Sequence, residues 1–170
     1  MRIYEGAPRQ NYEEVLRSVG AILDQRGMRE ITVLETDDGF VIQGLAPAPG
    51  EDRPWEDPAA RLEKETIQVR EDDLSRFMEE SLTRRAGRGR ARPGEAAGMV
   101  NAGFYEQALR VMGAYVDQQK PRDVLFFEQD RQFVMRLLMS TRAGLRHVLV
   151  EFTRDETESM VAAAYQMRGH

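Results

Sequence analysis

The spacing of hydrophobic residues changes along this 170-residue chain and predicts helices and strands in a fixed order. Between Asn11 and Gly27 the hydrophobic positions recur three or four residues apart, which predicts an amphipathic helix. Asn11 is suited to cap the first turn of this helix, and Gly27 is suited to end it. Beyond Gly27 the hydrophobic residues alternate with polar ones, which predicts strands, and Asp37-Asp38-Gly39 is typical of a hairpin turn. The elements expected after the first helix are strands at 30–36, 40–46 and 62–69 and a helix at 71–85.

The same succession begins again 93 residues further along the chain. Residues 105–138 align with residues 12–45 without a gap, and identical pairs include Tyr12/Tyr105, Leu16/Leu109, Gly20/Gly113, Asp24/Asp117, Glu35/Glu128, Asp37/Asp130 and Phe40/Phe133. The elements expected in this second copy are a helix at 103–119, strands at 123–128, 132–140 and 145–152, and a helix at 154–168 that Thr153 and Glu156 cap.

Gly20 and Gly113 fall in the middle of the first helix of each copy, where glycine costs ~1 kcal/mol relative to alanine. We therefore expect another element to approach each helix closely at this glycine.

The element order predicts an α+β fold, a tandem repeat of two α-β-β-β-α units with antiparallel sheets and helices packed on one side. We expect the units to be pseudo-two-fold related and to share one core. The expected boundaries are 1–86 for the first unit, 87–100 for a flexible Arg/Gly-rich linker and 101–170 for the second unit. This element order is similar to the start of the fold of type III secretion chaperones, which bind unfolded segments of partner proteins. The similarity is one of order alone, without a shared motif.

Composition excludes some classes of protein and some kinds of chemistry. Hydrophobic residues make up 41% and charged residues 31% of the chain, as in globular proteins, and no apolar run approaches the ~20 residues that span a bilayer. We expect a cytoplasmic protein that does not enter the membrane, because the N-terminus has no secretory signal. The chain has no cysteine, which excludes disulfides, thiolate chemistry and cysteine metal sites.

Charge is unevenly distributed along the chain. The net charge is −5, which argues against a broad surface for nucleic acid, but residues 84–94 carry five arginines and no acid. These arginines could contact phosphates, or they could form a soluble tether that attracts the acidic first unit. They are Arg84, Arg85, Arg88, Arg90 and Arg92.

Few residues are candidates for chemistry. The acids at the hairpins, Glu35, Asp37, Asp38, Glu128 and Asp130, could hold a hard cation such as Mg²⁺ or Ca²⁺, or could be ordinary turn acids on the surface. His147 lies on an expected strand without a serine or cysteine partner, and His170 is the terminal residue. We therefore predict no catalytic residue, no cofactor and no metal site.

The alternation of the strands assigns their two faces. The residues expected to face the helices and form the core are Ile31, Val33, Phe40, Ile42, Val124, Phe126, Phe133 and Met135. The opposite face would carry Leu34, Val41, Leu45, Leu125, Phe127, Val134 and Leu138. A solvent-facing sheet surface is usually polar, so this face needs a cover: the other repeat, a second copy of the chain, or a partner. We expect the other repeat to cover most of it, because the linker holds that repeat nearby, and a homodimer or a partner to cover the rest.

Trp55 lies in the long acidic loop before the third strand and could be an exposed interface anchor or a lid over the core. The sequence as a whole favours a non-catalytic protein-interaction module, either a binding or a chaperone-like protein, with a protein partner or self-association as a possible homodimer. The alternative is a nucleic-acid-associated protein that uses the arginine-rich linker. The third hypothesis is an enzyme or metal binder with carboxylates at the hairpin tips.

Overall fold

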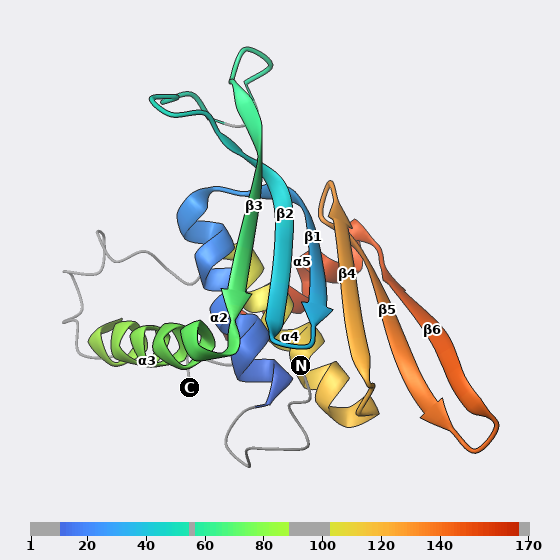
Figure 1. The fold of residues 1–170 in the computed structure, drawn as a ribbon. Coiled ribbons are helices and arrows are strands. Elements are labelled where there is room, and N and C mark those ends of the chain that lie inside the picture. The colour runs from blue at the N-terminus through green and yellow to red at the C-terminus, as the bar shows by residue number, and fades with distance from the viewer. Residues whose placement is uncertain (1–10, 55–56, 89–102, 167–170) are drawn as a thin grey trace.

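A computed structural model describes residues 11–54, 57–88 and 103–166 of the chain (Figure 1). The elements of the first unit are helix α2 (Tyr12–Arg26), strands β1 (Arg29–Thr36), β2 (Gly39–Pro47) and β3 (Leu62–Arg70), and helix α3 (Glu71–Arg88). The elements of the second unit are helix α4 (Phe104–Gln119), strands β4 (Asp123–Gln129), β5 (Gln132–Thr141) and β6 (Gly144–Phe152), and helix α5 (Arg154–Gln166). Every expected element is present, and most bounds differ from the predicted ones by one or two residues.

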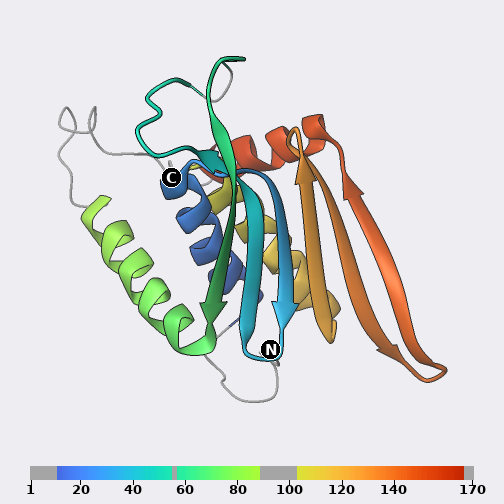
Figure 2. The same ribbon diagram turned by 45° about the horizontal axis from the view of Figure 1, so that its top comes forward.

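The fold is α+β, as predicted, with the six strands in one antiparallel sheet. The strand order is β3-β2-β1-β4-β5-β6, so β1 of the first unit lies beside β4 of the second. Val33 is paired with Phe126, which is its own equivalent 93 residues later. Helices α2 and α4 lie together against one face of the sheet, while the other face carries none of the described helices (Figures 1 and 2).

The local sequence determines where the elements end. The side chain of Asn11 accepts a hydrogen bond from the Glu14 N–H at 3.0 Å, and Gly27 ends α2 in the left-handed conformation with φ of 64°. At α5, the Thr153 N–H donates to the Glu156 carboxylate at 2.8 Å and the Glu156 N–H donates to the Thr153 hydroxyl at 3.3 Å. This reciprocal pair is the predicted capping box.

The two equivalent hairpins use different turns. Residues 37–38 and residues 130–131 both form two-residue turns. Asp130 and Arg131 both adopt positive φ, of 48° and 63°, whereas no positive φ occurs at residues 37–38. A glycine follows only the first of these turns. Gly39 has φ of 148°, and a Cβ atom there would lie 2.0 Å from the Val69 carbonyl oxygen of the neighbouring strand.

Helices α2 and α4 touch through their glycines. A Cβ atom on Gly20 would lie 2.3 Å from the Tyr105 carbonyl oxygen, and one on Gly113 would lie 2.4 Å from the Tyr12 carbonyl oxygen. Any larger residue would force the helices apart. The close approach predicted from the mid-helix glycines is therefore confirmed.

Each of these two helices also caps the other. The Asp117 carboxylate near the end of α4 accepts hydrogen bonds from the N–H groups of residues 12 and 13, at 2.9 and 3.0 Å. The Asp24 carboxylate near the end of α2 accepts from the N–H groups of residues 105 and 106, at 3.1 and 2.8 Å. Burial raises the pKa of Asp24 to about 6, and these two hydrogen bonds oppose the rise.

A buried ion pair lies in the same helix interface. The Arg17 guanidinium donates to the Glu106 carboxylate at 3.1 Å, and both side chains are less than a tenth exposed. Arg110 and Glu13, which the 93-residue offset relates to this pair, approach to 3.9 Å. Each of these contacts between the units thus has a counterpart between the residues that lie 93 positions away in the other unit. The two-fold relation between the units stays a prediction.

The core is continuous across the two units. Its buried cluster includes Val19 and Leu23 of α2, Leu109 and Val116 of α4, and residues of both sets of strands. The eight residues assigned to the helix-facing side of the sheet are all buried, which confirms the alternation argument. The units share this core as expected.

The region around the expected linker is described only in part. Helix α3 continues to Arg88, past position 86 where the first unit was expected to end. Residues 89–102 lie outside the described part of the chain. Among the described helices, none has the length and hydrophobicity needed to cross a membrane.

Candidate interaction surface

We call the sheet surface opposite α2 and α4 the open face. A row of side chains in register crosses five of its strands: Val41 on β2 pairs with Leu34, Leu34 with Leu125, Leu125 with Arg136, and Arg136 with Leu149 on β6. Residues directly opposite in an antiparallel sheet point to the same side. Four of the five members of this row are hydrophobic, and together they form a stripe across the sheet.

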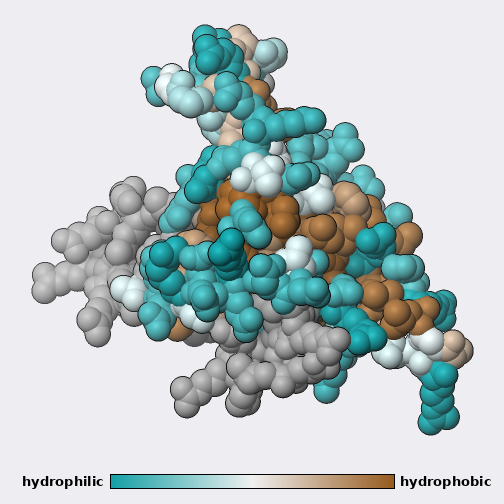
Figure 3. Space-filling view, in the orientation of Figure 1, coloured by the Kyte–Doolittle hydropathy of each residue, from teal (hydrophilic) through white to brown (hydrophobic). Residues whose placement is uncertain are grey.

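A second row lies beside the first. Thr32 pairs with Phe127, and Phe127 pairs with Val134 on β5. Leu34 is 42% exposed and Phe127 is 46% exposed, while Leu149 is 64% exposed. Hydrophobic residues gather over the centre of this face and continue toward β5 and β6 (Figure 3). Large hydrophobic side chains are thus exposed side by side rather than singly, which is the pattern of interaction surfaces.

The open-face residues predicted from the sequence are brought together, but their burial varies. Leu34 and Phe127 are exposed, Leu125 is only 8% exposed, and the half-buried members are Val41, Leu45, Val134 and Leu138. Two exposed leucines, Leu145 and Leu149, belong to the same face and were missed. Alternation along β6 would have identified both.

The expectation that the other repeat covers this face was wrong. The two units lie edge to edge in a single sheet, so their apolar faces point the same way and form one surface (Figure 2). The physical reason is that β1 and β4 supply backbone hydrogen bonds to each other, while α2 and α4 bury their apolar faces against one another and the shared sheet. This arrangement leaves the open face without a cover among the described residues.

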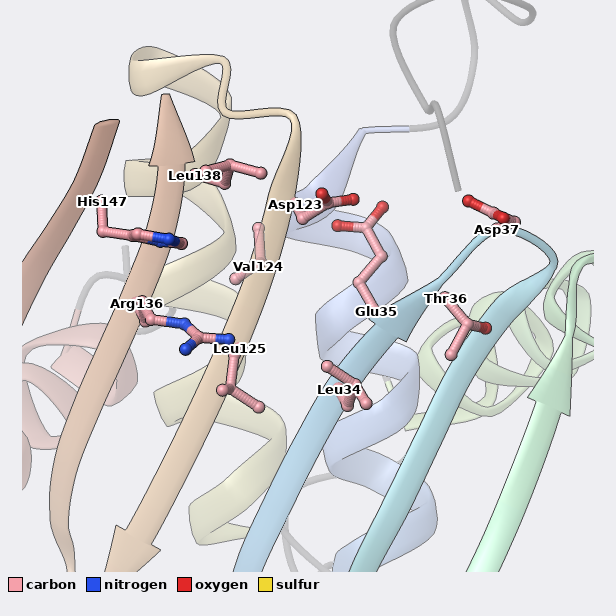
Figure 4. A pocket seen from close by; sticks show the side chains of 10 residues that line it. All are labelled: Leu34, Glu35, Thr36, Asp37, Asp123, Val124, Leu125, Arg136, Leu138 and His147. Carbon is pink, nitrogen blue, oxygen red and sulfur yellow. The ribbon is translucent and has the colours of Figure 1, made fainter. Parts of the chain in front are cut away.

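A hollow of about 370 Å³ lies where the pairing of β1 with β4 ends, and residues of both faces of the sheet line it. Figure 4 shows the Glu35 side chain turned toward Asp123 on one side of the hollow, with Arg136 and His147 reaching it from β5 and β6. Leu34, Leu125 and Leu138 are among its apolar lining residues, as is Val124. The hollow therefore combines acidic, basic and apolar groups.

Two of the hairpin acids are buried beneath the sheet rather than exposed at the turns. The Tyr12 hydroxyl donates to both Glu35 carboxylate oxygens at 2.8 Å, and the Tyr105 hydroxyl donates to Glu128 at 2.7 Å. Glu128 also accepts from the Arg131 N–H at 2.7 Å. The interpretation of these glutamates as surface turn acids was wrong, because the alternation that turns residues 31 and 33 inward also turns residue 35 inward.

The environment of Glu35 disfavours its charge. Burial raises the pKa of Glu35 to about 7, the hydrogen bond from Tyr12 opposes this rise, and the negative charge of Asp123 adds to it. Burial and Glu128 likewise raise the pKa of Tyr105, which keeps its hydroxyl neutral and able to donate. The tyrosine–glutamate pairs are thus structural contacts of the core.

The hairpin acids do not assemble into a metal site. No group of three or more His, Cys, Asp or Glu side chains suited to a metal ion occurs among the described residues. Asp37 and Asp38 are exposed at their turn, and the Asp130 carboxylate is paired with Arg154 at 3.2 Å. His147 is exposed on β6 beside Leu138. The described residues therefore add no support to an enzyme or a metal binder.

Two other predicted contact regions cannot be placed. Trp55, Arg90 and Arg92 lie outside the described residues. Arg84, Arg85 and Arg88 belong to the end of α3, but their side chains are likewise not described. The predicted roles of Trp55 and of the arginines stay predictions.

The chain matches no protein-family model, and no curated protein or solved structure is similar to it at a significant level.

Proposed function

We propose that this chain is a non-catalytic protein-interaction module whose binding surface is the open face of its sheet. The observation that carries the proposal is the exposure of hydrophobic side chains in the two neighbouring rows, chiefly Leu34 and Phe127. They lie on the side of the sheet that no described helix covers. Removing such a surface from water is favourable in proportion to its apolar area, at roughly 25 cal/mol per Å². A protein partner that lies on this face would gain that stabilisation.

The chemistry of the face indicates what kind of partner would fit. The stripe is mostly apolar, and Arg136, Asp37 and Asp123 are among the residues that line the hollow beside it. A segment with hydrophobic side chains along its middle and a charged group at one end would complement it. This chemistry supports a proposed binding or chaperone-like role, since an exposed apolar surface can accept hydrophobic segments without requiring one folded shape.

The test compares two double variants on the same face. Leu34→Ser/Phe127→Ser removes the apolar centre, whereas Gln43→Ser/Thr66→Ser changes exposed polar residues on neighbouring strands. We expect the wild type and the polar control to capture the same partner from lysates of cells that make the protein, and Leu34→Ser/Phe127→Ser to lose it. Thermal unfolding of all three proteins should confirm an intact fold. Equal capture by both variants, or no specific capture by the wild type, would contradict the proposal.

A further inference from the structure

In the described part of the chain, strand β6 is an edge of the sheet, and its sequence has few of the residues that usually protect such an edge. An edge strand leaves the N–H and C=O groups of alternate residues without a partner strand, and proteins protect such edges with charged residues, proline or a cover. The opposite edge, β3, carries four charged residues among nine: Glu63, Lys64, Glu65 and Arg70. In β6 the charged residues are Arg146 and Glu151, and there is no proline.

Both surfaces of β6 carry hydrophobic residues at the edge. On the open face, Leu145 is 59% exposed and Leu149 is 64% exposed. On the helix side, Val148 and Val150 are half-buried at the margin of the core. The core and the open face therefore both stop at β6 in the middle of apolar surface, where a further strand would continue them.

We propose that β6 pairs antiparallel with β6 of a second copy of this chain, about a two-fold axis at Leu149. The two six-stranded sheets then form one continuous sheet with both open faces on the same side. This geometry requires that directly opposed residues come from the same face, because a slip of one residue turns every side chain over. Several registers satisfy this condition. From one to the next, the residue that lies opposite a given position changes by two.

The side chains select one of these registers. With the axis at Leu149, that residue lies opposite Leu149 of the partner subunit, and Val148 lies opposite the partner's Val150 on the helix side. His147 then lies opposite the partner's Glu151, so that an imidazole N–H can donate to a carboxylate. An axis at Val148 would instead set Glu151 against the partner's Leu145, and an axis at His147 would set the two imidazoles against each other. The register centred on Leu149 thus sets leucine against leucine, valine against valine and His147 against Glu151, although it also sets Arg146 against the partner's Phe152.

This pairing goes beyond the proposed binding function and does not depend on it. Leu149 and His147 also belong to the open face, but the capture test changes Leu34 and Phe127 on β1 and β4, whereas the tests of the dimer change residues of β6. Loss of partner capture would leave the dimer intact, and loss of the dimer would leave each open face in place.

Cysteine substitution tests the register directly, because the chain has no cysteine of its own. In Leu149→Cys the two sulfur-bearing residues are directly opposed, about 5 Å apart, within the range of a disulfide. In Leu145→Cys, on the same strand and the same face, they are eight residues apart along the paired strands, or about 26 Å. We expect mild oxidation to give a covalent dimer on a non-reducing gel for Leu149→Cys and a monomer for Leu145→Cys. Equal cross-linking of the two variants, or none for Leu149→Cys, overturns the proposal.

A charge exchange provides a second test that needs no oxidation. We expect the wild type to have twice the chain mass of 19.5 kDa by light scattering. In His147→Glu, each new glutamate lies opposite Glu151 of the partner subunit. Repulsion between these carboxylates should return the measured mass to that of one chain. Adding Glu151→Lys should restore the dimer, since each new glutamate then lies opposite a lysine. Both residues are exposed, so circular dichroism should show an unchanged fold. A monomeric wild type, a dimer that His147→Glu leaves intact, or a failed rescue overturns the proposal.

Discussion

Single residues between the sheet and the helices carry charges that burial disfavours, and Glu35 is the clearest case. Its carboxylate lies in the core beneath β1, hydrogen-bonded by Tyr12. Its pKa is raised from 4.5 to about 7, chiefly by burial, so the folded protein holds a proton there more tightly than the unfolded chain does. The resulting stabilisation is present in full below about pH 4.5 and is lost as the pH rises through 7.

We predict that Glu35→Gln removes this dependence. The amide can still accept a hydrogen bond from Tyr12 but does not ionise. At about pH 8 the variant should be more stable than the wild type by up to about 3 kcal/mol, and the two should converge near pH 4.5. Urea unfolding across this pH range measures the difference. Asp38→Asn, at an exposed turn acid, serves as the control; a Glu35→Gln variant that follows the wild-type curve at every pH would refute the assignment.

The glycines between α2 and α4 allow a second prediction at the same scale. Gly20→Ala should destabilise the protein by roughly 1–3 kcal/mol, because the added methyl group would overlap the Tyr105 carbonyl and outweigh the ~1 kcal/mol gain in helix propensity. Gly113→Ala should do the same against Tyr12. Thermal unfolding would show this, with Gln25→Ala on the exposed side of α2 as a neutral control. A higher unfolding midpoint for Gly20→Ala would show that the helices can separate without cost.

Among the elements, α2 and α4 form the pair on which the fold depends most. Each helix carries an aspartate near its C-terminal end, where the helix dipole disfavours a negative charge. Each aspartate caps the N-terminus of the other helix instead, where the dipole favours it. An electrostatic cost within each helix is thus offset by a contact between helices.

We predict that Asp117→Ala costs about 1–2 kcal/mol of stability, because the N–H groups at the start of α2 lose their acceptor. Asp117→Asn should cost much less, since the amide oxygen can still accept. The same contrast should hold for Asp24→Ala and Asp24→Asn at α4. Chemical denaturation of the four variants measures it. If alanine and asparagine were equally tolerated at both positions, the reciprocal caps would not contribute to stability.

The molecule as a whole should behave as one folding unit. The units share a sheet, a core and two helix caps, so neither has a complete hydrophobic core alone. We predict that residues 1–100 and residues 101–170, made separately, each lack the dispersed amide spectrum of a folded protein. Mixing them should restore it, because the missing strand partner and caps return. A well-dispersed spectrum from either fragment alone would show that the units are independent.

Much of this architecture was predictable from the sequence, because local pattern determines local structure. The bounds of the helices and strands, the caps at Asn11 and Thr153, and the helix-facing side of the sheet all follow from spacing and side-chain chemistry. The joining of β1 to β4 did not follow, since hydrophobic alternation identifies a strand but not its neighbour. Because the pattern does not identify which strands are neighbours, it also led to the wrong expectation that one repeat covers the open face of the other.

Part of the candidate surface was predictable for the same reason. Alternation identified Leu34 and Phe127 as residues of the open face. It also implied that Glu35 points inward, but the position of this acid near a turn had suggested the surface. The alignment of the two copies identified Asp24 and Asp117 as identical residues. It did not indicate that each lies at a helix end where a negative charge is unfavourable. A negative charge at the wrong end of a helix is the sequence feature that would have indicated a contact with another element.

The reciprocal caps of α2 and α4 also determine when the chain can become stable during its synthesis. Asp117 follows Tyr12 by 105 residues, and at about 5–20 residues per second a ribosome needs roughly 5–20 seconds to add them. Throughout that interval the first helix has its local cap at Asn11 but lacks the Asp117 carboxylate and helix α4, which packs against it. Nascent chains on neighbouring ribosomes then expose the same hydrophobic surface together, so the yield of folded protein should depend on the speed of translation and on chaperones that shield the first half until the second emerges.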